Sequence, residues 1–379
     1  MQSFRLLASA AVLTAIATAA SAEDRTVGTK LVGVRATIVA DGLENPWGLD
    51  FLPGGRAIVT ERAGALRIVA KDGTLSEPAT GLPEVRASGQ GGLLDVIAAP
   101  DFETSHTIFY TFSQPGEGGA GTAVARATLS GTDAAPALDN VEVLFSMQRK
   151  TTRGQHFGSR LVFGPDGTLF VTTGDRGERD RAQDMSDSAG AVLRINQDGS
   201  VPADNPAPDG GDRLAQLWSK GHRNVQGADY DPLTGGLLVV EHGAQGGDEV
   251  NLAEAGKNYG WPVISYGVDY SGAKIGLGQQ AEGYEQPLHY WDPSIAPSGL
   301  AVYDGEMFPE WKGDLLVGAL KFGLLSRLDR DGQGKILGEE RMLDGEFGRI
   351  RDVNVAPDGS IWLLTDEADG AIVRLSRAS

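Results

Sequence analysis

Basic side chains recur beside short apolar segments at widely separated places in this chain. Three arginines and one lysine stand out by this position: Arg223, Lys321, Arg349 and Arg351. Gathering that many cations in one site requires an anionic partner, because each charge loses hydration there. A guanidinium pairs with a carboxylate in bidentate fashion. If the fold brings these residues together, they predict a site for a ligand that carries several carboxylates or phosphates.

One histidine also lies beside a short apolar segment. His156 directly precedes an apolar segment, and His222 and His242 have comparable surroundings. Histidine titrates near neutral pH and is the usual side chain for general base catalysis. We interpret His106 and His289 as ordinary surface or core residues. The chain has no G-x-S-x-G motif, and no G-x-G-x-x-G motif opens a helix in a βαβ unit, so neither a serine hydrolase nor a nicotinamide enzyme is supported.

Six repeats of one unit must position these residues. Each unit has a short apolar segment, a turn, a second apolar segment and a polar break. The units begin at Trp47, Gly92, Ser159, Gly227, Gly299 and Arg351. Their turns contain Pro53, Pro100, Pro165, Pro232, Pro309 and Pro357. A Pro-Asp-Gly turn between apolar segments indicates a hairpin, because proline fixes φ and glycine supplies a positive φ.

Further apolar segments follow several units, so each repeat has about four strands. Examples follow Ala65, Ala191, Leu324 and Ala371. Four strands make one propeller blade. We therefore predict an all-β fold, a six-bladed β-propeller of four-stranded blades. A β-sandwich has strands of similar spacing, but it does not explain the repeated turn. Segment 30–40 lies outside the six units, and we expect it to pair with the last blade and close the ring.

The repeat also predicts which residues share a face. The two strands of a unit are antiparallel, so the start of the first and the end of the second lie at the same rim. All six rims form one mouth, where a rigid scaffold holds the loops that bind ligands. Polar residues of these rims are Gln90, His156, Asp175, Arg223, Asn224, His242, Ser294, Lys321, Arg349, Arg351 and Asp366. Segments 176–188 and 256–287 interrupt the spacing and are predicted to be inserted loops.

The N-terminal residues predict export. Arg5 precedes an apolar stretch that ends in Ala20-Ser21-Ala22, which is typical of a secretory signal peptide cleaved after Ala22. Residues 23–379 then form a single propeller domain, periplasmic or secreted. The chain has no cysteine, so packing without disulfides stabilises it. Its net charge of −18 disfavours nucleic acid and anionic lipid as partners. No later segment is long and apolar enough to be embedded in a membrane.

Five short motifs, in order on the repeat frame, carry a resemblance to a known family. They are Gly89-Gln90-Gly91-Gly92-Leu93-Leu94, His156-Phe157-Gly158-Ser159-Arg160-Leu161, Gly221-His222-Arg223-Asn224, Gly246-Gly247-Asp248-Glu249-Val250-Asn251 with Asn258-Tyr259-Gly260-Trp261-Pro262, and Arg349-Ile350-Arg351-Asp352-Val353. Over essentially the whole mature chain, the sequence resembles the soluble quinoprotein aldose sugar and glucose dehydrogenases. The resemblance implies a six-bladed propeller that uses pyrroloquinoline quinone (PQQ) and calcium to oxidise aldoses at C1 to lactones.

The resemblance also implies roles for individual residues. His156 corresponds to the base that takes the proton from the sugar C1 hydroxyl while hydride passes to C5 of the quinone. Arg223 corresponds to the cation beside the reactive quinone oxygen, where negative charge develops. The implied cofactor contacts are Gln90, Arg223, Asn224, Ser294, Lys321, Arg349 and Arg351. The three carboxylates of PQQ would supply the anionic partner that the cations require.

Two calcium sites follow from the same resemblance. The backbone carbonyls of Gly243 and Ala244 correspond to ligands of the cofactor's calcium, a hard ion that takes oxygen ligands. Glu249 and Tyr259 correspond to a second, structural calcium site. Ala244 replaces a proline that is common in the family, so this loop is expected to be less rigid.

Two further positions depart from the family pattern. Gln155 precedes the base where the glucose enzyme has an acidic partner, which leaves the orientation of His156 open. Ser294 stands where a threonine contacts the cofactor. Segment 266–283 has no recognisable motif and is placed to cover the mouth. We interpret Trp47 and Trp261 as packing residues.

Two other functions remain open at this point. A calcium-dependent lactonase can occupy a six-bladed propeller, but it needs carboxylates and amides that converge on a metal in the channel. A non-enzymatic propeller could bind a polyanion or a protein. The dehydrogenase interpretation predicts an aldose substrate, an unidentified electron acceptor, and a monomer or homodimer.

Overall fold

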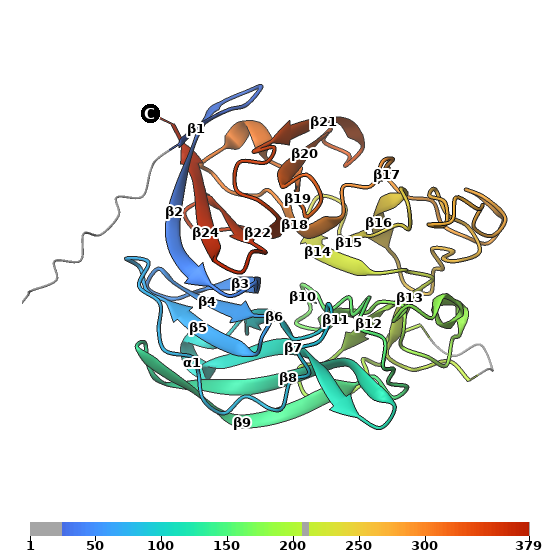
Figure 1. Ribbon diagram of the computed structural model, residues 1–379, viewed down its shortest axis with the longest axis horizontal. Coiled ribbons are helices and arrows are strands. Elements are labelled where there is room, and N and C mark those ends of the chain that lie inside the picture. The colour runs from blue at the N-terminus through green and yellow to red at the C-terminus, as the bar shows by residue number, and fades with distance from the viewer. Residues whose placement is uncertain (1–24, 207–211, 379) are drawn as a thin grey trace, which may run out of the picture.

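Six antiparallel β-sheets surround a common axis like the blades of a propeller (Figure 1). The computed structural model describes residues 25–206 and 212–378. The predicted signal peptide, residues 1–22, lies outside the described residues. In each sheet consecutive strands are hydrogen-bonded neighbours, so each repeat of the sequence builds one blade. The predicted fold class is confirmed.

The first three blades follow one another along the chain. Blade 1 has β3 (Pro46–Leu52), β4 (Arg56–Glu61) and β5 (Ala65–Val69). Blade 2 has β6 (Leu93–Ala98), β7 (Thr107–Gly116), β8 (Gly119–Thr132) and β9 (Ala135–Ser146). Blade 3 has β10 (Leu161–Phe163), β11 (Leu169–Thr172), β12 (Ala191–Ile195) and β13 (Leu217–Lys220).

The last three blades complete the ring. Blade 4 has β14 (Val225–Asp231), β15 (Gly236–Glu241), β16 (Asp248–Ala253) and β17 (His289–Trp291). Blade 5 has β18 (Pro297–Val302), β19 (Leu315–Ala319), β20 (Leu324–Arg330) and β21 (Ile336–Met342). Blade 6 has β22 (Ile350–Val355), β23 (Ile361–Thr365) and β24 (Gly370–Arg377), joined by β2 (Gly33–Leu43) and β1 (Arg25–Gly28) from the other end of the chain.

The ring closes as predicted. Strand β2 pairs with β24 over a register that runs from Val34–Arg377 to Leu43–Gly370. The innermost strands also contact their neighbours all the way round, β22 against β3 included. Closure leaves blade 6 with five strands. It also removes the open edge that an unclosed array of sheets would present.

Two local features differ from the predicted turns and strand number. Pro100 precedes a short helix, α1 (Phe102–Ser105), and Pro309 begins a 3₁₀ helix, η2 (Pro309–Trp311). Another 3₁₀ helix, η1 (Arg179–Gln183), lies in a segment predicted to be a loop. Blade 1 has three strands instead of four. The chain after β5 carries Pro78 and Pro83, which have no N–H to donate to a fourth ladder.

Apolar side chains pack between blades. Six clusters of buried residues each draw on two adjacent blades, for example Ile58 and Leu66 of blade 1 with Phe112 and Ala125 of blade 2. The faces of each sheet are therefore buried against the neighbouring sheets, which holds the ring rigid. Within residues 25–206 and 212–378, no helix is long and apolar enough to cross a membrane.

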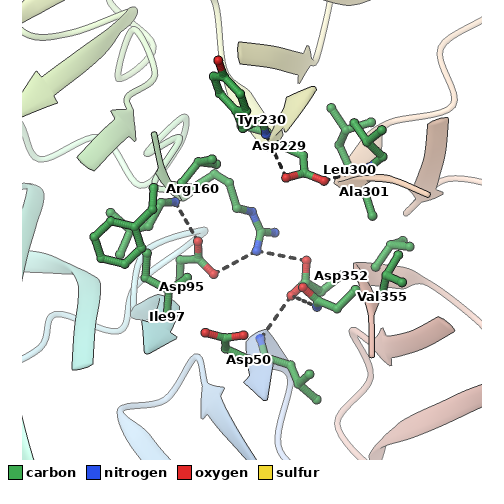
Figure 2. Close-up of a pocket in the computed structure, with 18 of the residues that line it drawn as sticks. Asp50, Asp95, Ile97, Arg160, Asp229, Tyr230, Leu300, Ala301, Asp352 and Val355 are labelled. Carbon is green, nitrogen blue, oxygen red and sulfur yellow. Dashed lines mark hydrogen bonds and ion pairs between the residues drawn. The ribbon is translucent and has the colours of Figure 1, made fainter. Parts of the chain in front are cut away.

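Aspartates of the innermost strands join neighbouring blades near the axis (Figure 2). Each accepts a hydrogen bond from a backbone N–H of the next blade: Ala98 donates to Asp50 (2.7 Å), Leu161 to Asp95 (2.7 Å), Val302 to Asp229 (2.8 Å) and Leu49 to Asp352 (3.1 Å). The guanidinium of Arg160 lies 2.9 Å from both Asp95 and Asp352. These contacts tie blade 1 to blades 2 and 6, blade 3 to blades 2 and 6, and blade 4 to blade 5 near the axis.

These aspartates line a cavity of about 360 Å³ formed by the later parts of the innermost strands. The other main cavity, described next, is lined by the residues where those strands begin. The two cavities therefore open toward opposite ends of the axis.

Candidate active site

A cavity of about 240 Å³ lies at the predicted mouth. Residues before the innermost strands and after the second strands line it: Trp47, Arg62, Gln90, Leu94, Phe157, Gly158, Gln226, His242, Ala296, Leu320, Lys321, Arg349 and Arg351. All six blades thus contribute, as the repeat predicts. The structure brings together four of the predicted residues here, Gln90, Lys321, Arg349 and Arg351. We call this space the cationic cavity.

A smaller cavity adjoins the cationic cavity, and His242 lines both. Among the residues around the smaller cavity are four from the predicted set: Arg223, Gly243, Glu249 and Tyr259. The other predicted residues line neither space. They are His156, Asn224, Ala244 and Ser294, which lie next to lining residues in the chain or in space.

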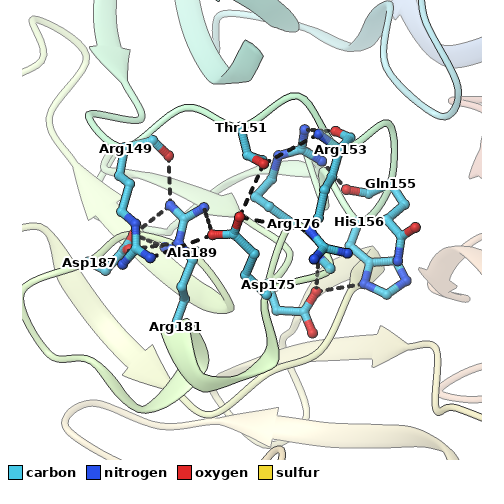
Figure 3. Close-up of polar contacts among 12 residues, drawn as sticks. Arg149, Thr151, Arg153, Gln155, His156, Asp175, Arg176, Arg181, Asp187 and Ala189 are labelled. Atoms are coloured by element: carbon cyan, nitrogen blue, oxygen red, sulfur yellow. Dashed lines mark hydrogen bonds and ion pairs between the residues drawn. The ribbon is translucent and has the colours of Figure 1, made fainter. Parts of the chain in front are cut away.

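His156 has the geometry of an oriented base. Its Nδ1 lies 2.6 Å from Oδ1 of Asp175 (Figure 3). Its backbone N–H donates to Oε1 of Gln90 at 2.7 Å. Asp175 also accepts hydrogen bonds from the indole of Trp261 (2.8 Å) and the N–H of Gly177 (2.6 Å). Nε2 of His156 makes no hydrogen bond within the described residues. An ionised Asp175 makes Nδ1 the protonated nitrogen and leaves the Nε2 lone pair free.

The electrostatics of this pair agree with that assignment. Burial lowers the pKa of His156 below its ordinary value; the contact with Asp175 opposes this, and the charges of Arg223 and Arg176 add to it. Burial acts to raise the pKa of Asp175, but the hydrogen bond from His156 and the nearby cations hold it below its ordinary value. His156 is therefore neutral and Asp175 ionised at neutral pH, the state that a general base requires.

Gln155 is not the partner of the base. Its carbonyl oxygen accepts a hydrogen bond from the guanidinium of Arg176, which also donates to the carbonyl of Arg153 at 2.7 Å. The same guanidinium lies 3.3 Å from the ring centroid of Phe157. Arg176 is fully buried and fixes the loop on either side of His156. Gln155 stands where the glucose enzyme has an acidic residue, and in this chain Asp175, just after the next strand of the same blade, contacts the ring of His156 instead.

Arg223 is held from three sides. Its N–H donates to Oε2 of Glu241 at 2.6 Å, and its Nη1 donates to the carbonyl of His242 at 3.2 Å. Its guanidinium lies 5.3 Å from the ring centroid of Trp261. Trp261, interpreted from the sequence as a packing residue, therefore touches both Asp175 and Arg223. The Nε of Arg223 is buried and has no hydrogen-bond partner among the residues that the structure describes.

Asn224 and Gln226 connect the base loop to the far side of the mouth. Oδ1 of Asn224 accepts hydrogen bonds from the N–H of Gly158 (3.1 Å) and from Nε2 of Gln226 (3.2 Å). Oε1 of Gln226 accepts a hydrogen bond from Arg351 at 3.0 Å. Nδ2 of Asn224 and Nε of Arg351 are buried, and neither has a hydrogen-bond partner in the described part of the chain. The sequence assigned no role to Gln226, although it lies only two positions after Asn224.

The cations of the mouth outnumber the carboxylates that pair with them. Asp366 forms an ion pair with Arg351 and lies 3.5 Å from Nη2 of Arg349, so one carboxylate serves two arginines. Within the described residues the side chain of Lys321 makes no ion pair and no hydrogen bond, and its Nζ lies 5.1 Å from the ring centroid of Phe322. These unpaired donors and charges fit an anionic ligand with several carboxylates or phosphates, which would pair with them and offset the burial of Arg223 and Arg351.

The loop expected to hold the cofactor's calcium is anchored at both ends. The N–H of Gly243 donates to Oδ1 of Asp248 at 2.8 Å, and Gln245 and Val268 exchange two backbone hydrogen bonds. The carbonyls of Gly243 and Ala244 lie between these anchors. The described residues contain no group of three or more acidic, histidine or cysteine side chains that could hold a metal ion. A site here would depend on backbone carbonyls, as expected from the sequence.

Glu249 is placed where a cation would be favourable. It lies directly opposite Glu241 on the neighbouring strand, and Asn251 donates to both carboxylates. Burial, followed by the charge of Glu241, raises the pKa of Glu249 to about 8. The hydroxyl of Tyr259 is already engaged with the backbone of Leu252 and Glu254. Tyr259 could therefore contribute its carbonyl, but its hydroxyl serves the fold.

The side chain of Ser294 is hydrogen-bonded to Asp248. Its hydroxyl donates to Oδ2 of Asp248 at 2.7 Å, and the N–H groups of Ile295 and Ala296 donate to the same oxygen at 2.8 and 2.9 Å. Ala296, not Ser294, lines the cationic cavity. The contact expected of Ser294 is thus absent from the lining, although the residue lies at the predicted rim.

The fold and the site together define a six-bladed propeller with an oriented His–Asp pair beside a cation-lined mouth, the class of the soluble sugar dehydrogenases. The family model for glucose / sorbosone dehydrogenase matches residues 43–374. The chain belongs to this family, which confirms the resemblance found in the sequence.

Individual relatives agree with this assignment. The aldose sugar dehydrogenase YliI of Escherichia coli is 41% identical over 347 residues, which cover 90% of this chain and 93% of YliI. A crystal structure of a glucose dehydrogenase superposes with a TM-score of 0.87 at 45% identity, covering 91% of this chain and 99% of that one. The PQQ-bound form of an aldose sugar dehydrogenase from Streptomyces coelicolor has a TM-score of 0.74 at 28% identity, over 90% of this chain and 98% of that chain.

Proposed function

We propose that this chain is a PQQ- and calcium-dependent aldose sugar dehydrogenase that oxidises the C1 hydroxyl of sugars and forms lactones. The observation that carries the proposal is the His156–Asp175 pair, 2.6 Å apart, beside a cavity whose lining cations outnumber the carboxylates that pair with them. One feature supplies a base and the other supplies a site for a polycarboxylate. The family and the PQQ-bound relative support the same function.

His156 is the general base of this proposal. Its free Nε2 accepts the proton of the sugar C1 hydroxyl, while Nδ1 keeps its proton toward Asp175. The imidazolium that results is stabilised by the carboxylate of Asp175, which Trp261 and Gly177 hold in place. Gln90 fixes the backbone of His156 and so sets the position of the ring.

When bound, PQQ supplies the hydride acceptor and calcium polarises it. Arg223 is the cation that would stabilise negative charge as it develops, because Glu241 holds its backbone N–H and the carbonyl of His242 holds its guanidinium before any ligand binds. Lys321, Arg349 and Arg351 would hold the carboxylates of the cofactor. The carbonyls of Gly243 and Ala244 would hold its calcium, and Glu249 with the carbonyl of Tyr259 would hold a structural calcium.

The two other functions receive less support. A lactonase of this fold requires carboxylates that converge on a metal, and at this mouth cations line the cavity instead. The carboxylates Asp50, Asp95, Asp229 and Asp352 gather at the opposite end, where backbone N–H groups of the next blade engage each of them. A binding protein without activity would not require the orientation of His156.

One experiment separates these functions. Purified apoprotein is incubated with PQQ and Ca²⁺, and reduction of a dye is followed with glucose and other aldoses. We expect dye reduction that requires both additions and is lost when a chelator removes the metal. Hydrolysis of lactones without dye reduction would support the lactonase, and cofactor binding without either reaction would support a binding protein.

The cellular setting follows from the same proposal. We propose that residues 1–22 direct export and are removed, that residues 23–379 act as one domain in the periplasm or outside the cell, and that a separate electron acceptor reoxidises the enzyme, which is a monomer or homodimer. N-terminal sequencing of protein recovered from the periplasm tests the cleavage after Ala22, and sedimentation tests the oligomeric state.

A further inference from the structure

Arg62 lines the cationic cavity together with Lys321, Arg349 and Arg351, but none of the motifs that carry the family resemblance contains it. It is the first residue after β4, the second strand of blade 1. His242 and Asp366 occupy the corresponding position in blades 4 and 6, directly after β15 and β23.

The main chain and stem of Arg62 are closely packed. Its N–H donates to the carbonyl of Asn45 at 3.1 Å, and its own carbonyl accepts the N–H of Leu93 at 3.2 Å. Gly92 lies so close that a Cβ there would meet the carbonyl oxygen of Arg62 at 2.0 Å and its Cγ at 2.6 Å. The start of the side chain is therefore fixed by two neighbouring segments, and a glycine is required beside it.

The guanidinium has no such partner. Arg62 is half-buried, and within the described residues its side chain makes no hydrogen bond and no ion pair. Asp366, at the corresponding rim position of blade 6, is already engaged by Arg351, by Arg349 and by the amide of Asn45. The charge of Arg62 still reaches this cluster, since it contributes to holding the pKa of Asp366 at about 2.

A half-buried guanidinium beside two other arginines is costly unless an anion joins it. We propose that Arg62 binds a carboxylate of the cofactor directly and forms, with Lys321, Arg349 and Arg351, a set of four cations around it. This inference rests on the proposed function, because it takes the polycarboxylate PQQ as the occupant of the cationic cavity. It makes Arg62 a determinant of cofactor affinity that the family motifs do not include.

The test measures binding and does not depend on turnover. Apoprotein with Ca²⁺ is titrated with PQQ, and the dissociation constant is taken from quenching of tryptophan fluorescence and from equilibrium dialysis, at two or more salt concentrations. The variants are Arg62→Gln, Arg62→Met and Arg62→Lys. Arg56→Gln is the matched control, because Arg56 lies at the other end of β4 and pairs with Asp133 at the surface.

We expect Arg62→Gln and Arg62→Met to weaken PQQ binding about 10-fold or more, the usual effect of losing a charge-assisted hydrogen bond. Their affinity should also depend less steeply on salt, since one ionic contact is gone. Arg62→Lys should recover part of the loss, and Arg56→Gln should bind like the unmodified protein. Thermal melting of each variant shows whether the fold is retained, and two neutral replacements keep the test available if one of them fails to fold.

Unchanged affinity and salt dependence in a folded neutral variant would overturn the role of Arg62. Failure of the unmodified protein to bind PQQ at all would instead overturn the proposed function. The two failures are thus distinguished by the unmodified protein alone.

Discussion

Nδ1 of His156 lies 2.6 Å from Oδ1 of Asp175, although 19 positions separate the two residues in the chain. His156 precedes the innermost strand of blade 3 and Asp175 follows its second strand, so the hairpin of that blade brings them together. The carboxylate fixes the tautomer of the ring, and the indole of Trp261 fixes the carboxylate. The base is therefore oriented before any substrate arrives.

Replacing Asp175 with asparagine tests this orientation. Without the carboxylate, Nδ1 is no longer required to carry the proton, and the imidazolium loses its counter-charge. We expect kcat to fall about 10²-fold or more, while the dissociation constant of PQQ stays within about 2-fold because Asp175 lines neither cavity. An Asp175→Asn enzyme with unaltered kcat would contradict the positioning role.

The same variant has a signature in its pH profile. Burial lowers the pKa of His156, Asp175 raises it, and Arg223 and Arg176 lower it. Activity that requires neutral His156 should increase with pH through a midpoint below the ordinary histidine value. Removing Asp175 removes the group that favours the protonated ring, so the midpoint of kcat/KM should move to lower pH. A shift to higher pH would show that a different group titrates.

Replacing His156 with alanine removes the proposed base and leaves the cations of the mouth in place. PQQ binding should be retained, since the side chain of His156 is not part of the lining of the cationic cavity. Turnover should drop about 10²–10⁴-fold, the usual contribution of a general base. Dye reduction and fluorescence titration of the same preparation measure the two quantities. Full activity of the folded variant would exclude His156 as the base.

Arg160 should stabilise the ring. Its guanidinium joins Asp95 of blade 2 and Asp352 of blade 6, and all three side chains are buried. Arg160→Met leaves two buried carboxylates without a cation, which typically costs about 3–5 kcal/mol of unfolding free energy. Denaturant unfolding measures the loss. Arg126→Met is the control, because its pair with Glu142 is largely exposed and should contribute only about 0–1 kcal/mol.

The buried carboxyl of Asp229 should make the free energy of unfolding depend on pH. Burial raises its pKa to about 7; the N–H groups of Val302 and Tyr230 oppose this, and the charges of Asp304 and Asp231 add to it. Between about pH 4 and pH 7 the folded chain therefore holds a proton that the unfolded chain releases, so this group makes stability fall as pH rises. Above about pH 7 both states are ionised and its contribution is constant.

The variant Asp229→Asn isolates that contribution. Its amide cannot titrate, so the decrease in melting temperature between pH 5 and pH 8 should be smaller than in the unmodified protein. The variant loses an acceptor for one of two backbone N–H groups at every pH, so the comparison uses the slope and not the absolute stability. An equal slope in both proteins would mean that Asp229 is ionised in the folded state throughout this range.

The sequence predicts the ring and the shared mouth because both follow from periodicity. The turn spacing places Gln90, Lys321, Arg349 and Arg351 at one face, and the structure gathers all four around one cavity. Periodicity does not say which side chains pair across that face. The repeat therefore places Asp175 at the same rim as His156, but it does not identify Asp175 as the partner of the base.

Local competition for hydrogen bonds explains the remaining differences. Ser294 reaches the predicted rim, but the nearer carboxylate of Asp248 takes its hydroxyl. Arg62 occupies a rim position that the repeat could have indicated, but it lies in blade 1, where no recognised motif drew attention to it. Pro78 and Pro83 disfavour a regular fourth strand in that same blade, because neither can donate a backbone N–H to a ladder.

The pairing of β2 with β24 makes the propeller a non-covalent loop with its clasp in blade 6. The clasp brings together segments from both ends of the described chain, and its formation costs the entropy of closing that long loop. Once this pairing has formed, the ring should no longer depend on which blade the chain begins in. A circular permutant that joins the ends of β1 and β24 and opens the chain between two blades should therefore rebuild the same mouth, whereas removal of β2 should release the ring.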